Sequence, residues 1–353
     1  MKHLLDMSLA ELAAEMAELG EPAYRAVQVL RWVWQRGAAD FQAMSNLPDE
    51  LRRALAERLT VLAGRIVRRD EARDKVVKLL IQWPDGQHIE SVLIPVHGRI
   101  TACVSTQAGC AMGCAFCASA IGGLGRSLTA GEIVEQVLQL QRAGGEAQEP
   151  ELRVTHVVFM GMGEPLANYE ATVSAVRTLI DPERGGLSGR HMTISTVGLP
   201  QAIRRLAGEG IPVTLAISLH APDDELRQRL IPSARGVAIA EILAAGQDYF
   251  ARTGREFTIE YLLLRRVNDG AEHAVRLAEL VRPLRCNVNL IRYNLVGGLP
   301  FHQPDRARTM AFRDRLLAMG INVQVRASRG ADARAACGQL RRRSGPAAGG
   351  AAD

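Results

Sequence analysis

The chain has 353 residues, of which 47% are hydrophobic and 23% charged, and its formal net charge is +5. These values are ordinary for a soluble protein that can bury a full catalytic core plus a smaller appendage. No apolar run is long enough to span a bilayer, and acids interrupt the apolar N-terminal stretch, so we expect neither a membrane protein nor a secretion signal. The positive charge suggests a polyanionic partner, although a GC-rich genome, which enriches arginine and alanine together, explains it equally well.

Residues 1–60 are predicted to form a small helical unit. A capping box starts the first helix at Ser8, and its apolar-periodic run ends at Gly20. A second helix is predicted over 22–37 and a third over 48–59. The apolar stripe of the second helix is expected to consist of Ala23, Val27, Leu30 and Trp34. Its opposite face carries Arg25, Arg31 and Arg36. Tryptophans with interleaved arginines are typical of a nucleic-acid surface, and equally of core aromatics beside a solvated face.

Residues 61–98 are predicted to form a β-hairpin extension, with strands over 75–83 and 88–96 around a Pro-Asp-Gly turn. In the second strand Glu90 shares a face with two apolar side chains. A carboxylate in such a place is costly unless it is paired or used. The spacing alone favours a salt bridge to arginine or lysine over a functional role.

From residue 99 to residue 340 the pattern predicts alternating strands and helices. The strands are expected at 100–105, 154–160, 191–195, 213–219, 257–263, 288–293 and 321–326. The helices are expected near 129–143, 168–181, 200–208, 238–252, 271–282 and 305–319. Apolar strands without strict alternation are typical of parallel strands, so the pattern predicts an α/β barrel or a doubly wound sheet. The Arg-, Gly- and Ala-rich tail at 341–353 is predicted to be disordered.

The loop from Cys103 to Cys117 is the most informative stretch of the sequence. It places Cys110, Cys114 and Cys117 at the spacing C-x3-C-x2-C, which is the signature of radical S-adenosylmethionine (SAM) enzymes. Three thiolates can hold three irons of a [4Fe–4S] cluster and leave the fourth iron open for SAM. A zinc site would need a fourth ligand, for which Cys103 lies too near along the chain. Clustered cysteines in a chain of this length indicate metal binding or catalysis in a reducing cytoplasm.

Short polar groups follow several predicted strands, as they do at the active sites of barrel enzymes. After the second strand, Gly163 lets backbone approach a ligand closely, and Glu164 can accept from the amine of SAM. After later strands come groups suited to a nucleoside ligand, namely Ser195, Ser218, Leu219, His220 and Asn294. Each alone is explained equally well as a strand cap or a structural residue, but together they predict one pocket. Cys337, in a polar loop before a glycine, is a candidate reactive thiol or an ordinary cysteine.

Several strings in chain order resemble the RlmN/Cfr family of radical-SAM RNA methyltransferases. They are PAYRAVQVLRWVWQRG, FQAMSNLP, the cysteine loop, FMGMGEPL, STVG, SLHAPDDELRQRLIP, RYN and AACGQL, and the resemblance covers nearly the whole chain. One departure is CASAIGGLGR, in which we expect a threonine nearer Ser119 or Ala120. The resemblance implies an incomplete (β/α)6 radical-SAM barrel over 99–340, with the N-terminal helical domain engaging RNA.

The resemblance also implies roles for individual residues. Cys110, Cys114 and Cys117 match the ligands of the [4Fe–4S] cluster. The positions that match SAM contacts are Gly163, Glu164, Ser195, Ser218, Leu219, His220 and Asn294. Cys337 matches the cysteine that is methylated and carries the methyl group to RNA. Cys103 matches the cysteine that releases the product by a disulfide with Cys337, and Glu90 matches the proton acceptor.

The activity that the resemblance implies is methylation of carbon 2 of an adenosine in 23S rRNA and in tRNA. Carbon 2 is a poor nucleophile, so a radical is required, and generating it is cofactor chemistry. One SAM would methylate Cys337, and cleavage of a second SAM would yield the radical that activates this methyl group. We also expect a flavodoxin- or ferredoxin-type electron donor and a monomeric, cytoplasmic protein. The alternatives are Cfr-type methylation at carbon 8 and an RNA-binding iron–sulfur protein without catalysis.

Overall fold

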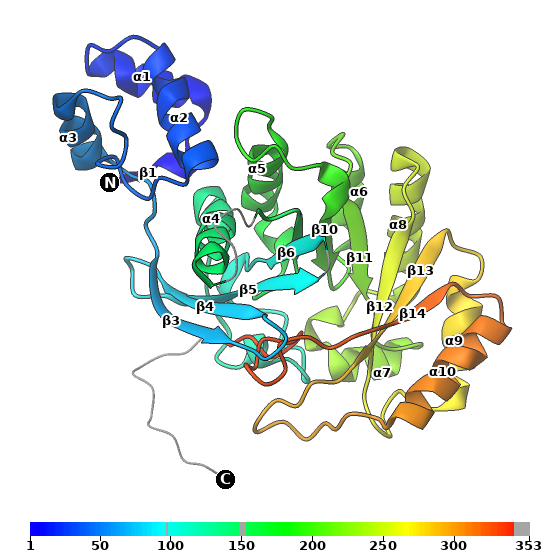
Figure 1. Cartoon of the computed structure of the whole chain (residues 1–353). Coiled ribbons are helices and arrows are strands. Elements are labelled where there is room, and N and C mark those ends of the chain that lie inside the picture. The colour runs from blue at the N-terminus through cyan, green and yellow to red at the C-terminus, as the bar shows by residue number, and fades with distance from the viewer. Residues whose placement is uncertain (97, 148–152, 342–353) are drawn as a thin grey trace.

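A ten-stranded sheet forms the centre of the computed structural model, which describes residues 1–96, 98–147 and 153–341 (Figure 1). From one edge to the other the strand order is β14-β13-β12-β11-β10-β9-β6-β5-β4-β3. The strands from β14 to β6 pair in parallel, whereas β5, β4 and β3 pair antiparallel. Apart from Arg341, the tail predicted to be disordered lies outside the described residues.

The parallel strands and their helices form the predicted incomplete α/β barrel. The strands are β6 (Arg99–Cys103), β9 (His156–Phe159), β10 (Met192–Thr196), β11 (Thr214–Ser218), β12 (Phe257–Leu263), β13 (Cys286–Arg292) and β14 (Val323–Arg326). The helices are α4 (Ala130–Ala147), α5 (Tyr169–Ile180), α6 (Pro200–Ala207), α8 (Ile239–Thr253), α9 (Ala271–Val281) and α10 (Arg306–Ala318), which cover the outer side of the sheet in Figure 1. The strand β12 is buried along nearly its whole length, as expected for a strand that is covered on both faces.

The structure contains two short features near the cysteine loop that the sequence pattern does not predict. One is the helix α7 (Asp224–Leu230), which the side chain of Asp223 caps. The other is a small sheet in which β7 (Gln107–Gly109) pairs with β8 (Leu124–Ser127). Elements this short do not display an apolar period. Because β7 and β8 lie directly before and after the cysteine loop, their pairing closes the base of that loop.

The predicted hairpin is formed by β4 (Val77–Gln82) and β5 (His88–Val96), and a third strand joins it. This strand, β3 (Arg65–Glu71), pairs with β4 and is mostly exposed. Because it buries almost no side chains, its sequence shows no alternation of apolar and polar residues that would predict a strand. On the other side β5 pairs with β6, the first barrel strand. The extension is therefore continuous with the barrel sheet, and one face of it belongs to the barrel interior.

The N-terminal unit consists of three helices, α1 (Leu9–Glu18), α2 (Tyr24–Arg36) and α3 (Asp49–Arg58). The predicted capping box of Ser8 and Glu11 is present. The predicted stripe of α2 is wrong, because its buried residues are Ala26, Val29, Leu30 and Val33. Small and β-branched side chains let α2 pack closely against α1, while the bulky Trp34 is only half-buried. In Figure 1 this unit stands apart from the barrel strands, at the end of the molecule near α4 and α5.

After β14 the chain crosses back under the sheet toward β4 and β5 (Figure 1). Hydrogen bonds tie this segment to the extension: Asp74 accepts from the amide of Gly330 at 3.0 Å, and the amide of Arg73 donates to Asp332 at 3.0 Å. The segment therefore brings Cys337 next to the antiparallel strands. No helix of the described residues is both long and apolar enough to cross a membrane.

Candidate active site

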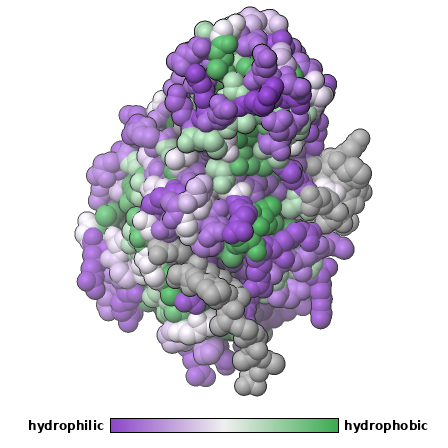
Figure 2. Space-filling view, turned by 90° about the vertical axis from the view of Figure 1, so that its left-hand side faces the viewer, coloured by the Kyte–Doolittle hydropathy of each residue, from purple (hydrophilic) through white to green (hydrophobic). Residues whose placement is uncertain are grey.

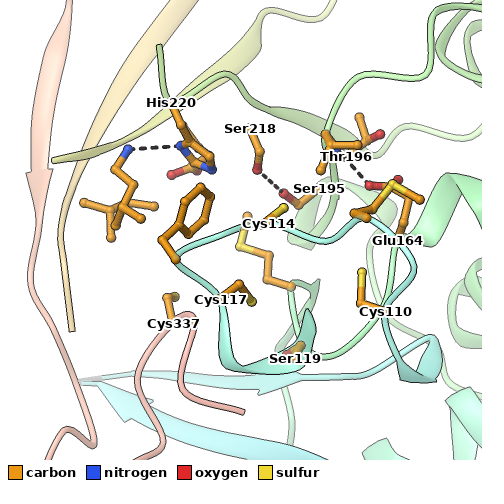
Figure 3. Close-up of a pocket in the computed structure, with 18 of the residues that line it drawn as sticks. Cys110, Cys114, Cys117, Ser119, Glu164, Ser195, Thr196, Ser218, His220 and Cys337 are labelled. Atoms are coloured by element: carbon orange, nitrogen blue, oxygen red, sulfur yellow. Dashed lines mark hydrogen bonds between the residues drawn. The ribbon is translucent and has the colours of Figure 1, made fainter. Parts of the chain in front are cut away.

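A cavity of about 160 Å³ lies at the carboxyl ends of the parallel strands (Figure 3). It is far larger than the space that a single water needs. Nine of the residues singled out in the sequence line it: Cys110, Cys114, Cys117, Gly163, Glu164, Ser195, Ser218, His220 and Cys337. Four others, Glu90, Cys103, Leu219 and Asn294, lie behind this lining. The fold thus gathers these residues from the cysteine loop, from the ends of β9, β10 and β11, and from the C-terminal segment.

The three cysteines of the loop carry free thiols and are half-buried. Burial raises the pKa of Cys110 to about 11, and burial also raises the pKa of Cys114 and of Cys117. Iron would offset this cost, because a thiol that coordinates a metal is deprotonated. Among the described residues no three Cys, His, Asp or Glu side chains are arranged to share one metal ion. Three cysteines of one loop that line the same cavity are a donor set suited to a cluster, in which each thiolate binds a different iron.

His220 and Phe116 support the cysteine loop from the barrel side. Phe116, within the loop, meets the His220 ring edge-on with ring centroids 5.1 Å apart. Nδ1 of His220 accepts a hydrogen bond from the amide of Leu262 at 3.0 Å, and burial lowers the pKa of the ring to about 3. The imidazole is therefore neutral, with its proton on Nε2. His220 has the left-handed φ of +61°, a costly backbone conformation of the kind that is often found at functional sites.

Glu164, predicted to accept from the amine of SAM, also holds two loops together. Its two carboxylate oxygens accept from the amides of Leu166 at 3.0 Å and Val197 at 2.8 Å. Burial raises its pKa to about 7, although these amides oppose the shift. The carboxylate therefore ties the loop after β9 to the loop after β10. Its neighbour Gly163 has φ +100°, and a Cβ there would lie 2.6 Å from Cβ of Gln107, so only glycine fits.

Of the other residues predicted to contact SAM, two line the cavity and two lie outside its lining. Oγ of Ser195 and Oγ of Ser218 lie 3.4 Å apart on the cavity wall (Figure 3). Leu219 is fully buried, and its amide donates to the carbonyl oxygen of Glu260. Asn294 does not line the cavity; its amide nitrogen donates to the carbonyl oxygen of Cys337 at 3.1 Å. Asn294 therefore positions the backbone of the C-terminal segment at Cys337.

Cys337 is exposed, and its neighbours bind the first cysteine loop directly. The amide of Ala118 donates to the carbonyl oxygen of Gly338 at 2.8 Å, and Oγ of Ser119 donates to that of Leu340 at 2.6 Å. Cys103 lies at the end of β6 with only 7% of its surface exposed. Burial, and secondarily the charge of Cys337, raises its pKa to about 12. Both thiols are free, so the disulfide implied by the family resemblance is not formed here.

Glu90 is paired, as its position in the strand suggested. Its Oε1 lies 3.1 Å from Nζ of Lys78, and both side chains are nearly inaccessible to solvent. Its Oε2 accepts from the amide of Arg341 at 2.9 Å. The salt bridge does not exclude a chemical role, because the carboxylate also contacts the segment that carries Cys337.

Three charged residues near the cavity are not identified by the sequence. Arg326 at the end of β14 and Glu260 on β12 form an ion pair at 3.4 Å on the cavity wall. Arg227 of α7 is buried, and Nη2 donates to the carbonyl oxygen of Val197, but no described residue bonds its Nε or Nη1. Burial lowers the pKa of Arg227 to about 10, and the nearby Cys114 opposes this shift. These contacts depend on barrel closure, so no local signal could have revealed them.

A barrel of parallel strands with a C-x3-C-x2-C loop at their carboxyl ends defines the radical-SAM class of enzymes. Residues 104–278 match the family model described as "Radical SAM superfamily". A crystal structure of a radical SAM methyltransferase from Sphaerobacter thermophilus is 46% identical to this chain and has a TM-score of 0.93. The match covers 97% of this chain and 99% of that structure.

Residues 2–61 match the model described as "Ribosomal RNA large subunit methyltransferase N-terminal domain". The "Probable dual-specificity RNA methyltransferase RlmN" of Symbiobacterium thermophilum is 47% identical over 342 residues, which are 96% of this chain and 91% of that protein. A relative with the same name in Thermotoga neapolitana is 44% identical, with 97% and 98% covered. The chain belongs to the RlmN family of radical-SAM RNA methyltransferases.

Proposed function

We propose that this protein methylates carbon 2 of a specific adenosine in 23S rRNA, and in tRNA, through a methyl group carried on Cys337. The observation that supports this most directly is that Cys337 lines the same cavity as the cysteine loop. The amide of Ala118, next to Cys117, donates to the carbonyl oxygen of Gly338, next to Cys337. A thiol held at that point is within reach of a ligand bound at the cysteine loop.

Cys110, Cys114 and Cys117 would hold a [4Fe–4S] cluster, and SAM would occupy the cavity between the loop and the strand ends. When bound, the cluster supplies the electron that cleaves SAM and so provides the radical that activates the methyl group on Cys337. A flavodoxin- or ferredoxin-type protein would deliver that electron. Ser195, Ser218 and neutral His220 offer polar groups on the wall opposite the cysteines, suited to a ribose and a carboxylate.

Cys337 on the cavity wall, with Glu90 and Cys103 outside the cavity lining, completes the proposed reaction. The activated methyl group on Cys337 adds to the base and links protein to RNA. Glu90 then takes the ring proton, directly or through water, and its bond to the amide of Arg341 places it beside the Cys337 segment. The unpaired electron left on the adduct would return to the cluster, which lost one electron when SAM was cleaved. Cys103 would then attack Sγ of Cys337: a disulfide forms, the bond between that sulfur and the transferred carbon breaks, and the carbon takes up a proton to complete the methyl group on the base.

RNA would contact the N-terminal unit as well as the cavity. The lobe made of α1, α2 and α3 has a mostly hydrophilic surface in Figure 2. On α2, Arg31 and Arg36 are exposed, and the guanidinium of Arg36 lies 4.3 Å from the centre of the Trp32 ring. Arginines supported in this way are suited to RNA phosphates and bases.

The test is a Cys337→Ala variant compared with Cys286→Ala. Both variants are reconstituted anaerobically, and iron content and RNA methylation are measured. We expect Cys337→Ala to keep its iron and lose methylation entirely, because the other three cysteines that line the cavity are the proposed cluster ligands. Cys286 begins β13 outside the cavity lining, so its variant should behave as wild type.

Normal methylation by Cys337→Ala would refute the methyl-carrying role. Mass spectrometry of digested RNA locates the methyl group, and a product methylated at carbon 8 would replace the carbon-2 proposal with the Cfr-type activity. If the reconstituted wild-type protein does not convert SAM to 5′-deoxyadenosine, the protein is not catalytic in the proposed sense.

A further inference from the structure

Lys78, on β4, contacts three different segments of the protein through one ammonium group. Its Nζ lies 3.1 Å from Oε1 of Glu90 on β5 and 3.8 Å from Oδ2 of Asp70 on β3. It also donates to the carbonyl oxygen of Arg334, in the C-terminal segment, at 3.2 Å. Only 3% of the side chain is exposed. The ammonium group thus has two acceptors within 3.2 Å, Glu90 and the carbonyl oxygen of Arg334, and a more distant carboxylate in Asp70.

The register of the sheet explains why this cation faces the site. Lys78 pairs with Val92 of β5, and Val92 pairs in turn with Cys103 of β6. Glu90 precedes Val92 by two positions and so points to the same face of β5. Lys78, Glu90 and Cys103 therefore share the face on which the C-terminal segment lies.

The Lys78–Glu90 pair holds the C-terminal segment at two points, one on either side of Cys337. Lys78 binds the carbonyl oxygen of Arg334, and Glu90 binds the amide of Arg341. Arg334 has φ +52°, a left-handed conformation that costs free energy in a residue other than glycine. Such a conformation persists only where surrounding contacts hold it, and Lys78 provides one of these contacts.

We propose that Lys78 is a positioning residue, which holds the Glu90 carboxylate and the Cys337 loop (residues 334–341) in one fixed arrangement. The proton acceptor and the methyl carrier then approach the target base as a unit. This inference rests on the roles proposed above for Glu90 and Cys337. The simpler alternative is that Lys78 only neutralises a buried carboxylate. The hydrogen bond to Arg334 distinguishes the two roles, because neutralising Glu90 does not require it.

The test compares four full-length variants reconstituted with the cluster: Lys78→Met, Glu90→Gln, the double variant and Lys75→Met. Lys78→Met alone leaves a buried carboxylate without its cation and can fail to fold. The double variant removes the unpaired charge of Glu90 and still lacks the hydrogen bond from Lys78 to Arg334. Lys75→Met is the matched control, because Lys75 lies on the same extension with its side chain 66% exposed.

Hydrogen exchange of the Cys337 loop is the first measurement. The amides of Arg334 and Ala335 donate within the segment, so their exchange reports its opening. Loss of a hydrogen bond from a charged donor should speed their exchange about tenfold in the double variant relative to Glu90→Gln. Lys75→Met should match wild type. If the double variant exchanges as slowly as Glu90→Gln, Lys78 only neutralises Glu90 and the proposal is overturned.

Single-turnover formation of the crosslink between Cys337 and RNA, which precedes the step that needs Glu90, is the second measurement. A positioning role predicts that the crosslinking rate in the double variant falls about tenfold below that of Glu90→Gln, with the affinity for RNA unchanged. Equal crosslinking rates would refute the positioning role. Failure of the wild-type protein to methylate RNA would instead refute the proposed function. The exchange measurement does not depend on turnover, so it would still test whether Lys78 holds the Cys337 loop.

Discussion

The two cysteines Cys103 and Cys337 differ in their exposure to solvent. Cys337 is exposed at the cavity, whereas Cys103 is buried at the end of β6 with a pKa near 12. In the proposed reaction the exposed thiol would meet both SAM and RNA, and the buried one would react only after its partner has moved toward it. This difference matches a sequence of roles in which Cys337 acts first and Cys103 last.

The order of these roles predicts a trapped intermediate. In a Cys103→Ala variant the crosslink between Cys337 and RNA should form but not resolve, because the attacking thiol is missing. A denaturing gel of labelled RNA should show a slowly migrating adduct that protease removes. Cys286→Ala serves as the control and should give none. Absence of the adduct from Cys103→Ala, with normal iron content, would exclude Cys103 as the resolving residue.

At this scale the sequence identified the residues whose signal is local. The spacing of Cys110, Cys114 and Cys117 needs no knowledge of the fold, and the structure brings all three to one cavity. The spacing of Glu90 favoured a salt bridge, which is present, but its partner Lys78 could not be identified without the strand register. Arg326 meets Glu260 only because the barrel brings the ends of two strands together.

The small β7–β8 sheet holds the cysteine loop at its base. The carbonyl oxygen of Gly123 accepts from the amide of Cys110 at 3.2 Å across this sheet. Gly109 has φ +85°, and a Cβ at this position would collide with that carbonyl oxygen. The conformation and the space thus both require glycine.

Gly109→Ala should therefore disturb the placement of Cys110 directly. We expect this variant to bind clearly less iron on reconstitution and to lose about 1–3 kcal/mol of stability. Gly122→Ala is the matched control: its φ is +89°, but a Cβ there meets nothing within 4 Å. It should show the conformational cost alone and keep its iron. Equal iron contents in the two variants would mean that the β7–β8 pairing does not set the cysteine geometry.

The N-terminal unit is fastened to α4 through His3. Nε2 of His3 lies 3.0 Å from Oε2 of Glu135, a fully buried carboxylate that also accepts from the amides of Ala63 and Gly64. Burial alone would lower the pKa of His3, but the hydrogen bond and charge of Glu135, helped by Asp6, raise it above 6.5. The protonated form is thus favoured in the folded protein.

A raised histidine pKa stabilises the fold below the unfolded value of 6.5, and this contribution is lost as the pH rises through the folded pKa. Comparing the melting temperatures of wild type and His3→Gln should therefore give a larger difference at pH 6 than at pH 9. Differential scanning fluorimetry of the protein without cluster is sufficient. A difference that grows toward pH 9 would contradict the ion pair.

The barrel strands and their long helices were predictable, whereas the short helix α7 and the β7–β8 pair were not. The strand at 257–263 and the helices near α5, α9 and α10 match the structure within a residue or two, because their apolar patterns extend over several turns or a whole strand. The buried stripe of α2 was misassigned because two apolar stripes compete on this helix. Only packing against α1 decides between them.

The whole molecule separates the candidate active site from a helical lobe on which α2 exposes the arginines Arg31 and Arg36. If the lobe binds RNA, its arginines should govern affinity through phosphate contacts rather than through the reaction. Replacing Arg31 and Arg36 by glutamine should weaken RNA binding and lower the slope of log K against log salt by about one for each lost contact. Arg315→Gln, exposed at the end of α10, is the control and should leave the slope unchanged. Unchanged binding by the α2 variant would place the RNA elsewhere.

The C-terminal segment has a consequence for the biogenesis of the protein. Its hydrogen bonds join residues 251 and 259 positions apart, between Glu90 and Arg341 and between Arg73 and Asp332. Contacts over such separations form only after nearly all of the chain has left the ribosome. A nascent or prematurely terminated polypeptide would thus display the loop of Cys110, Cys114 and Cys117 while lacking Cys337. The contacts that hold the Cys337 loop against β5 form only once residue 341 has been translated.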